Sequence, residues 1–299
     1  MSVRSRRLEE KIFIILSGAS AIFTAFILIV ILGTITISGL PSINLQYLTS
    51  AEASLQGAGS GVANAIIGTI YLSLFSVAIS LPLALSLAIY LKRYAKDTYV
   101  TRFIRLLIEV FSGTPSIIVG VVGLILICLY LKPITGGWSL LSGSIALAIL
   151  ILPVVERSIE VAIDTVPLEL EDASYALGAN KWHTIRGITL PCAISGIIAG
   201  TVFGIGRAAE ESAVVALTTG YSQYMPEYSI GHNSKLLFGI QIYPFQDAIG
   251  SLPMAIYNSF QYPMFESSGG GFRAAFILIL IILIINMSAR LILRRWKIG

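Results

Sequence analysis

The chain has 299 residues, of which 56% are hydrophobic and only 12% are charged, and its mean hydropathy is +0.85. An ordinary globular domain carries about 25% charged residues, so a soluble chain of this composition lacks the polar side chains to cover its surface. The composition also excludes an intrinsically disordered chain, and two cysteines in apolar runs, Cys128 and Cys192, exclude a disulfide framework. We therefore expect a polytopic membrane protein.

Six apolar segments along the chain are long enough to span a bilayer. A spanning helix needs about 20 mostly apolar residues, because the hydrocarbon core is about 30 Å thick. The sequence thus predicts an all-α protein with six transmembrane helices, the first of which is too long for the apolar region of a cleavable signal peptide. The predicted spans are residues 12–37, 65–91, 111–131 (with a start as early as 103), 140–155, 187–206 with a continuation over 213–218, and 274–289.

The basic residues gather in four of the segments outside these spans. Of the 20 Lys and Arg residues, 16 lie in the N-terminus, the second and fourth connections, and the C-terminal tail. Because Lys and Arg concentrate in cytoplasmic segments, we expect a multi-pass protein of the cytoplasmic membrane with both termini in the cytoplasm. The basic residues follow the membrane topology, so their number gives no support to a role in nucleic-acid binding.

Two segments fall on the external side of this topology. Residues 38–64 hold Gly57, Gly59 and Gly61, but the chain has no G-x-x-x-x-G-K-[ST] sequence, so nucleotide hydrolysis has to come from another polypeptide. Residues 220–272 are rich in Tyr, Pro and Gly. They predict either short helices at the membrane interface or a surface on which a partner docks.

The cytoplasmic connection between the fourth and fifth spans predicts a rigid elbow. Thr165 and Pro167 signal a helix start, acidic residues occupy its first turns, and Gly178 is placed to end it. A second short element follows before the fifth span. Helices that lie on a membrane usually carry Lys or Arg on their polar face, so this acidic elbow favours docking on another protein over lying on the bilayer.

The elbow resembles the EAA signature of ABC importer permeases. The resemblance rests on Glu171 and Ala173, on the run Leu177, Gly178 and Ala179, and on a Leu-Pro pair at 190–191. In that family the elbow is the coupling helix that fits a cleft on the ATPase subunit. The resemblance therefore implies that these five residues couple this chain to an ATPase.

Two further stretches are similar to phosphate permeases of the PstA type. They are residues 113–120 (GTPSIIVG) and 206–213 (GRAAEESA), and residues 251–257 (SLPMAIY) also resemble an external stretch of that family. The likeness runs from about residue 65 to the C-terminus. It implies a type I ABC importer permease fold, with residues 1–64 as an N-terminal transmembrane helix and external loop and residues 65–299 as the permease core. The chain departs from the family at Glu210, where Gly is usual, and at Val214, where Pro is usual.

Three charged residues, Arg207, Glu210 and Glu211, interrupt the fifth span. A charge near the bilayer centre costs at least about 2.5–3.5 kcal/mol, and the i,i+3 and i,i+4 spacings predict one salt-bridged helix face. The resemblance implies that Arg207 and Glu211 lie on the path of the substrate, with Glu210 as an added acid beside it. The guanidinium stays charged and its planar donors match phosphate oxygens. The alternative is that the cluster anchors the helix at the outer membrane edge.

Two further sequence patterns predict how the spans pack and bend. Gly196, Gly200 and Gly204 repeat every four residues, a spacing that lets two helices approach closely, so we expect them to pack against another span. The Thr-Pro-Ser sequence at 114–116 predicts a kink or a cap in the third span. The apolar segments show neither metal-ligand spacing nor a Ser/His/Asp arrangement.

Residues and resemblance together predict the transmembrane permease subunit of a phosphate ABC importer, a transporter component and not an enzyme. The resemblance implies a PstC-like second permease, an ATPase dimer that binds ATP and Mg²⁺, an extracytoplasmic phosphate-binding protein, and no cofactor in this chain. Three alternatives stay open: a permease for sulfate, molybdate or tungstate; a membrane enzyme that uses Glu210 and Glu211 as paired acids; and a stand-alone channel.

Overall fold

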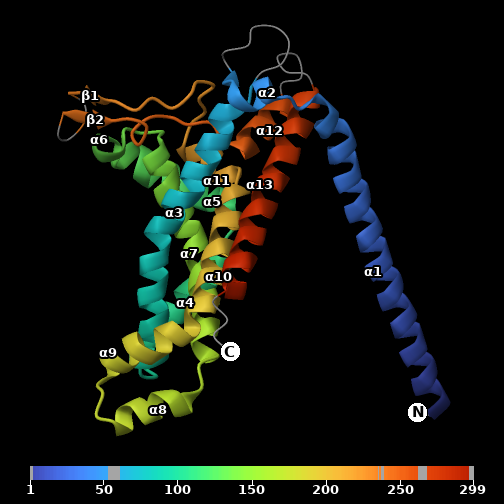
Figure 1. Ribbon diagram of the computed structural model, residues 1–299, viewed down its shortest axis with the longest axis vertical. Helices are drawn as coiled ribbons and strands as arrows, with labels where there is room; N and C mark the ends of the chain where they lie inside the picture. The colour runs from blue at the N-terminus through green and yellow to red at the C-terminus, as the bar shows by residue number, and fades with distance from the viewer. Residues whose placement is uncertain (1–2, 53–60, 235, 237–238, 262–267, 296–299) are drawn as a thin grey trace.

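A computed structural model shows a helical bundle with a two-stranded hairpin at one end (Figure 1). It describes residues 3–52, 61–234, 236, 239–261 and 268–295. Gly57 and Gly59 of the predicted glycine-rich loop and Lys297 of the basic C-terminus lie outside these residues. The prediction of a mostly helical protein is confirmed.

The described elements follow one another in the order of their numbers. Three short π-helical segments, η3, η4 and η5, extend or begin longer helices, and η1 is a 3₁₀ turn. The bounds are α1 (Val3–Gly39), η1 (Leu40–Ser42), α2 (Leu45–Thr49), α3 (Ala63–Ile89), η3 (Tyr90–Tyr94), α4 (Tyr99–Gly113), α5 (Ser116–Gly123), η4 (Leu124–Tyr130), α6 (Lys132–Thr135), α7 (Leu140–Asp164), α8 (Leu168–Ala176), α9 (Lys181–Thr184), η5 (Ile185–Thr189), α10 (Leu190–Ala209), α11 (Ala213–Thr218), β1 (Ile230–His232), β2 (Ile240–Ile242), α12 (Leu252–Gln261) and α13 (Ser268–Arg295).

Helix α7 forms the centre of the bundle and packs against α3 on one side and α10 on another. One apolar cluster joins the three helices in the half of the molecule nearer α8, with Ile151, Val155 and Ile159 fully buried. A second cluster in the other half holds Leu140 and Leu147 of α7 together with residues of α5 and α11. Buried apolar area is the main stabilising term of such a core, so α7 is the element on which the other helices are assembled.

Four helical stretches are long and apolar enough to cross a membrane: Glu10–Gly39, Ala63–Tyr94, Lys181–Ala209 and Gly269–Leu291. A fifth passes the same test only if Tyr99–Gly113 and Ser116–Tyr130, which are bent by 103° at their junction, form one broken span. The predicted count of six is therefore not confirmed by length and composition within the described residues. The fourth predicted span lies in α7, most of which is buried inside the bundle.

The 103° bend falls on the predicted Thr-Pro-Ser sequence. Pro115 lacks a backbone N–H, and its ring disfavours a helical conformation at the residue before it. Thr114 accordingly has a ψ of 130° and Pro115 a ψ of 134°, both extended. The predicted kink is confirmed, and it separates α4 from α5.

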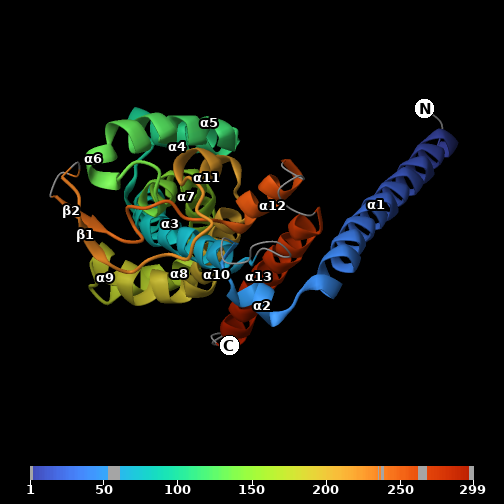
Figure 2. The same cartoon turned by 90° about the horizontal axis from the view of Figure 1, so that it is seen from above.

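Helix α1 stands apart from the bundle and meets it at one end (Figures 1 and 2). Its apolar stretch is fully exposed, and the contact is made where Gly39 approaches the backbone of Phe272 at the start of α13. The N-terminal end of α1, the C-terminal end of α13, and α8 all lie at the same end of the molecule (Figure 1). The opposite end carries α2, α12 and the antiparallel hairpin, in which Ile230 faces Ile242.

The segment expected to be external holds both helix and strand. The predicted short helix is present as α12, whose Leu252 N–H donates to Thr69 Oγ1 of α3 at 2.8 Å. The hairpin β1–β2 was not part of the all-α expectation. Its six residues project from the bundle beside α6 (Figure 1), so they do not alter the helical core.

Candidate functional site

The elbow is built from α8, a turn at Gly178, and α9. Gly178 has a φ of +86°, a left-handed conformation that costs an ordinary residue about 1–2 kcal/mol. Asn180 then caps α9, since its side chain accepts a hydrogen bond of 2.9 Å from the N–H of His183. The predicted helix–glycine–helix arrangement is therefore present, and its turn requires a glycine.

Three large apolar residues of the elbow are exposed. The side chain of Leu177 is 90% exposed, that of Leu168 65% and that of Trp182 56%. A Cβ atom built on Gly178 would meet no atom within 4 Å, so the turn itself is also open. Apolar side chains gathered on an exposed surface mark a site of protein–protein contact.

Glu171 points the other way, into the molecule. It is 4% exposed and accepts hydrogen bonds from Arg93 Nε at 2.9 Å and from Thr189 Oγ1 at 2.8 Å. These contacts tie α8 to η3 and to η5. Glu171 is therefore an anchor of the elbow, whereas Ala173, Leu177 and Gly178 are exposed and Ala179 is half-buried.

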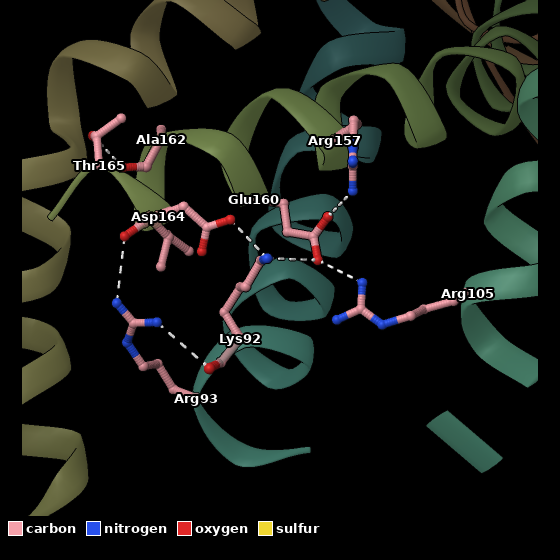
Figure 3. A network of polar contacts seen from close by, with 9 residues as sticks. Lys92, Arg93, Arg105, Arg157, Glu160, Ala162, Asp164 and Thr165 are labelled. Carbon is pink, nitrogen blue, oxygen red and sulfur yellow. Dashed lines mark hydrogen bonds and ion pairs between the residues drawn. The ribbon is translucent and has the colours of Figure 1, made fainter. Parts of the chain in front are cut away.

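A cluster of ion pairs joins the helices at the same end (Figure 3). Glu160 of α7 accepts from Arg105 of α4 at 2.8 Å and from Arg157 at 2.6 Å, and it lies 3.4 Å from Lys92 Nζ. Lys92 also pairs with Asp164 at 2.7 Å. Next to it, Arg93 donates to the carbonyl oxygen of Ile163 at the end of α7 at 3.3 Å.

This cluster was not predicted from the sequence. The basic residues of η3 and α4 were interpreted only as markers of topology, although the acidic residues of α7 recur at a helical spacing at positions 156, 160 and 164. That spacing puts them on one face and was the available signal. The structure shows that η3 links the elbow, through Arg93, to α7 and α4, through Lys92 and Glu160.

Arg207 and Glu211 lie at the other end of α10. Arg207 Nη1 is 3.2 Å from Glu211 Oε2, and the side chains are 40% and 5% exposed. Glu211 also accepts from the N–H of Ala213 at 3.2 Å. The predicted pair is present, with its carboxylate buried and its guanidinium open on one side.

Glu210 does not join this pair. The fifth span was expected to continue as one helix, but α10 ends at Ala209 and α11 begins at Ala213. In the described part of the chain Glu210 has no ion pair, and its exposed side chain lines an open cavity with Tyr257 of α12 and Leu278 of α13. The expectation of one face shared by Arg207, Glu210 and Glu211 is wrong, because the helix breaks between them.

The glycine row of α10 lies against α7 of the same chain. A Cβ atom on Gly200 would come within 2.7 Å of Ser158 Cβ, and one on Gly204 within 2.6 Å of Val155 Cγ2. A Cβ on Gly196 would collide with Ala162. These glycines therefore sit where two helices approach closely. Among the described residues, no group of three or more His, Cys, Asp or Glu is placed to hold a metal ion.

The helical bundle and its exposed elbow agree with the family that the sequence matches. The chain belongs to the family described as "Binding-protein-dependent transport system inner membrane component", which matches residues 80–298. It is a transporter subunit whose ATPase is a separate polypeptide, so the alternative of a membrane enzyme is excluded.

Two relatives match nearly the whole chain. It is 30% identical to the phosphate transport system permease protein PstA of Yersinia pestis, over 98% of this chain and 92% of that protein. It is 29% identical to the probable ABC transporter permease protein YqgI of Bacillus subtilis, over 96% and 95%. The predicted resemblance to permeases of the PstA type is confirmed.

Solved structures of other transporters share the fold. A bacterial alginate ABC transporter, in complex with an alginate pentasaccharide-bound periplasmic protein, superposes with a TM-score of 0.65 at 16% identity over 99% of this chain and 98% of that one. The MetNI methionine ABC transporter in an inward-facing form gives a TM-score of 0.57 at 18% identity over 79% and 94%. The importer permease fold is thus established.

Proposed function

We propose that this chain is the permease subunit of a phosphate ABC importer and moves inorganic phosphate across the cytoplasmic membrane. The main observation in favour of phosphate as the substrate is the Arg207–Glu211 pair, in which a partly exposed guanidinium is held by one buried carboxylate. A guanidinium matches phosphate oxygens with two parallel donors. The full-length relatives named as phosphate permeases support the same substrate.

In this proposal Arg207 exchanges partners as the anion passes. Its single ion pair leaves most of its five N–H donors open, so phosphate can bind before Glu211 is released. Glu211 keeps the hydrogen bond from Ala213 N–H throughout, which holds its carboxylate in place. Glu210 lies outside the pair and adds negative charge beside the path.

The elbow would receive the motion of an ATPase dimer that binds ATP and Mg²⁺. The exposed Leu168, Leu177 and Trp182 supply the apolar contact, and Ala173, Gly178 and Ala179 leave room for close approach. Glu171 would pass the displacement on to η3 through Arg93, and Lys92 and Glu160 would pass it to α7 and α4.

Two further partners complete the assembly. A PstC-like second permease would form the other half of the pathway, and a phosphate-binding protein would dock at the α12 end, outside the cell. Residues 65–299 form the core in this arrangement, with α1 as an added membrane anchor. The N-terminal end of α1, the C-terminal end of α13 and the elbow, which share one end of the molecule (Figure 1), would face the cytoplasm.

Uptake of radiolabelled phosphate tests this proposal. Cells that lack their own high-affinity system would express the chain together with the other subunits of its transporter, with excess sulfate or molybdate as competitor. We expect uptake that depends on the chain and resists both competitors. Uptake abolished by either competitor, or no uptake at all, would overturn phosphate as the substrate while the importer architecture would stand.

A further inference from the structure

A cavity of about 280 Å³ opens between α4 and α7 beside the ion-pair cluster. Its polar lining includes Arg105 and Ser112 of α4 and Glu156, Arg157 and Glu160 of α7. The function proposed above makes no use of Glu156 or of the cavity. Our inference rests on that function and concerns a second binding site on the same translocation path.

Glu156 is a buried acceptor that lacks a donor. The residue is 1% exposed, and its Oε1 has no hydrogen-bond partner among the described residues. Glu160, one turn away, forms ion pairs with three cationic side chains, those of Lys92, Arg105 and Arg157. A buried polar atom without a partner is destabilising, so the arrangement around Glu156 is complete only when something in the cavity donates a hydrogen bond to it.

The two arginines of the cavity have donors to spare. In the described structure Arg105 and Arg157 each use one nitrogen, Nη1, and both direct it to Glu160. A guanidinium carries five N–H donors, and these side chains are 40% and 69% exposed. Each can therefore hold Glu160 and an additional anion together.

We infer that this cavity binds inorganic phosphate as a protonated oxyanion. Arg105 and Arg157 donate to its unprotonated oxygens, and Glu156 accepts a hydrogen bond from a P–O–H group. Phosphate keeps at least one such group at neutral pH, whereas sulfate is fully ionised and offers only acceptors. A site with a buried polar group of fixed role rejects an analogue that leaves the group unpaired, so Glu156 discriminates phosphate from sulfate.

The cavity shares lining residues with a second, wider groove that extends toward the end of α10. This groove of about 740 Å³ shares Ser112, Pro153 and Arg157 with the cavity and runs along α7 and α10 to Phe203. Gly200 also lines this groove, and Arg207 follows it by seven residues, which is two helical turns on the same side and about 10 Å along the axis. The groove therefore extends from the cavity toward the part of α10 that carries Arg207, and we place the two sites on one path.

The test uses protection of a thiol introduced at the cavity mouth. Ser112→Cys would be combined with Cys192→Ser, which removes the exposed native thiol, in the assembled transporter in inside-out membrane vesicles. The reagent is the neutral thiol probe N-ethylmaleimide, and the ligands are inorganic phosphate and sulfate. We expect phosphate to slow modification and sulfate to leave its rate unchanged.

Two substitutions assign the effect to the carboxylate. Glu156→Gln should raise the phosphate concentration for half-protection by about tenfold or more, because a neutral amide replaces the charged acceptor of the P–O–H hydrogen bond. Glu109→Gln is the matched control, because it removes the charge of an exposed carboxylate at the same cavity. It should not raise the concentration for half-protection, because it removes a negative charge beside the bound anion.

Several results would overturn the inference: equal protection by sulfate, no protection by phosphate, or the same effect from Glu109→Gln as from Glu156→Gln. Phosphate uptake by the doubly substituted transporter is measured in parallel. Uptake without protection would refute this site alone. Absence of phosphate uptake even by the unsubstituted transporter would refute the proposed function as well.

Discussion

Two sets of ion pairs, one at each end of α10, differ in how their cations are held. At the α8 end, Arg93 is 13% exposed and binds both the carboxylate of Glu171 and the carbonyl oxygen of Ile163. At the far end, Arg207 is 40% exposed, and among the described residues its one ion pair is with Glu211. The first arrangement joins several helices, whereas the second leaves donors open.

The difference separates a fixed joint from an exchangeable contact. Removing one partner of a buried ion pair is strongly destabilising, because the other charge stays buried and uncompensated. An exposed charge is solvated and loses little when its partner leaves. The α8 end is therefore suited to carry force between elements, and Arg207 is suited to bind and release an anion.

The largest effect is expected from Glu171→Ala. It leaves the guanidinium of Arg93 buried without its carboxylate, which costs about 3–5 kcal/mol. Thermal unfolding of the purified protein in detergent measures the loss, with Glu169→Ala as control, since Glu169 is an exposed acid in the first turn of the same helix. Equal unfolding temperatures for the two variants would contradict the anchoring role of Glu171.

A smaller effect is expected where α10 approaches α7. Gly200→Ala pushes a methyl group to within 2.7 Å of Ser158 Cβ, and such overpacking costs about 1–3 kcal/mol. Gly206→Ala is the matched control, because its Cβ would meet no atom within 4 Å. The same unfolding assay should show destabilisation for the first variant and none for the second. A reversed order would refute the close packing.

Two substitutions at Gly178, in the turn of the elbow, distinguish backbone strain from loss of ATPase docking. Gly178→Ala and Gly178→Arg share a backbone strain of about 1–2 kcal/mol, but only arginine places a long charged side chain on the open outer surface. We expect Gly178→Ala to retain ATPase association and Gly178→Arg to lose both association and uptake, as measured by co-purification and phosphate transport. An unimpaired Gly178→Arg transporter would refute the elbow as the ATPase contact.

The smallest effect belongs to the surface pair Asp97–Arg102, whose side chains are 75% and 65% exposed. The guanidinium of Arg102 lowers the pKa of Asp97 from its ordinary value, so the pair is intact at neutral pH and is lost only in acid. Exposed pairs contribute little to stability, so Asp97→Asn should leave the unfolding temperature unchanged at pH 7. A clear drop in the unfolding temperature would contradict this expectation, because it would show that the charged residues at the α8 end stabilise one another as a network.

Local signals in the sequence predicted the parts that depend on a single stretch of chain. The Pro115 bend and the glycine turn at 178 follow from backbone chemistry, and the long apolar runs give α1, α3 and α13. Contacts between distant elements were out of reach. No local pattern shows that Glu171 turns inward to Arg93, or that Glu156 and Glu160 face α4.

The end of α10 shows the same limit. Spacing alone placed Arg207, Glu210 and Glu211 on one face, since it assumed an unbroken helix. The break after Ala209 moves Glu210 away and leaves Glu211 paired. The fourth predicted span lies in α7, which is mostly buried by its neighbours, and burial of this kind cannot be read from hydropathy.

Phosphate uptake by Arg207→Ala, measured beside ATPase association in the same vesicles, tests the central claim most directly. We expect uptake to fall by about tenfold or more, the effect of losing a charge-assisted hydrogen bond, while the ATPase stays bound. Arg207→Lys keeps the charge without the planar donors. Its uptake should lie between that of Arg207→Ala and that of the unsubstituted transporter. Unchanged uptake by Arg207→Ala would contradict the account, because the anion would then pass without this guanidinium.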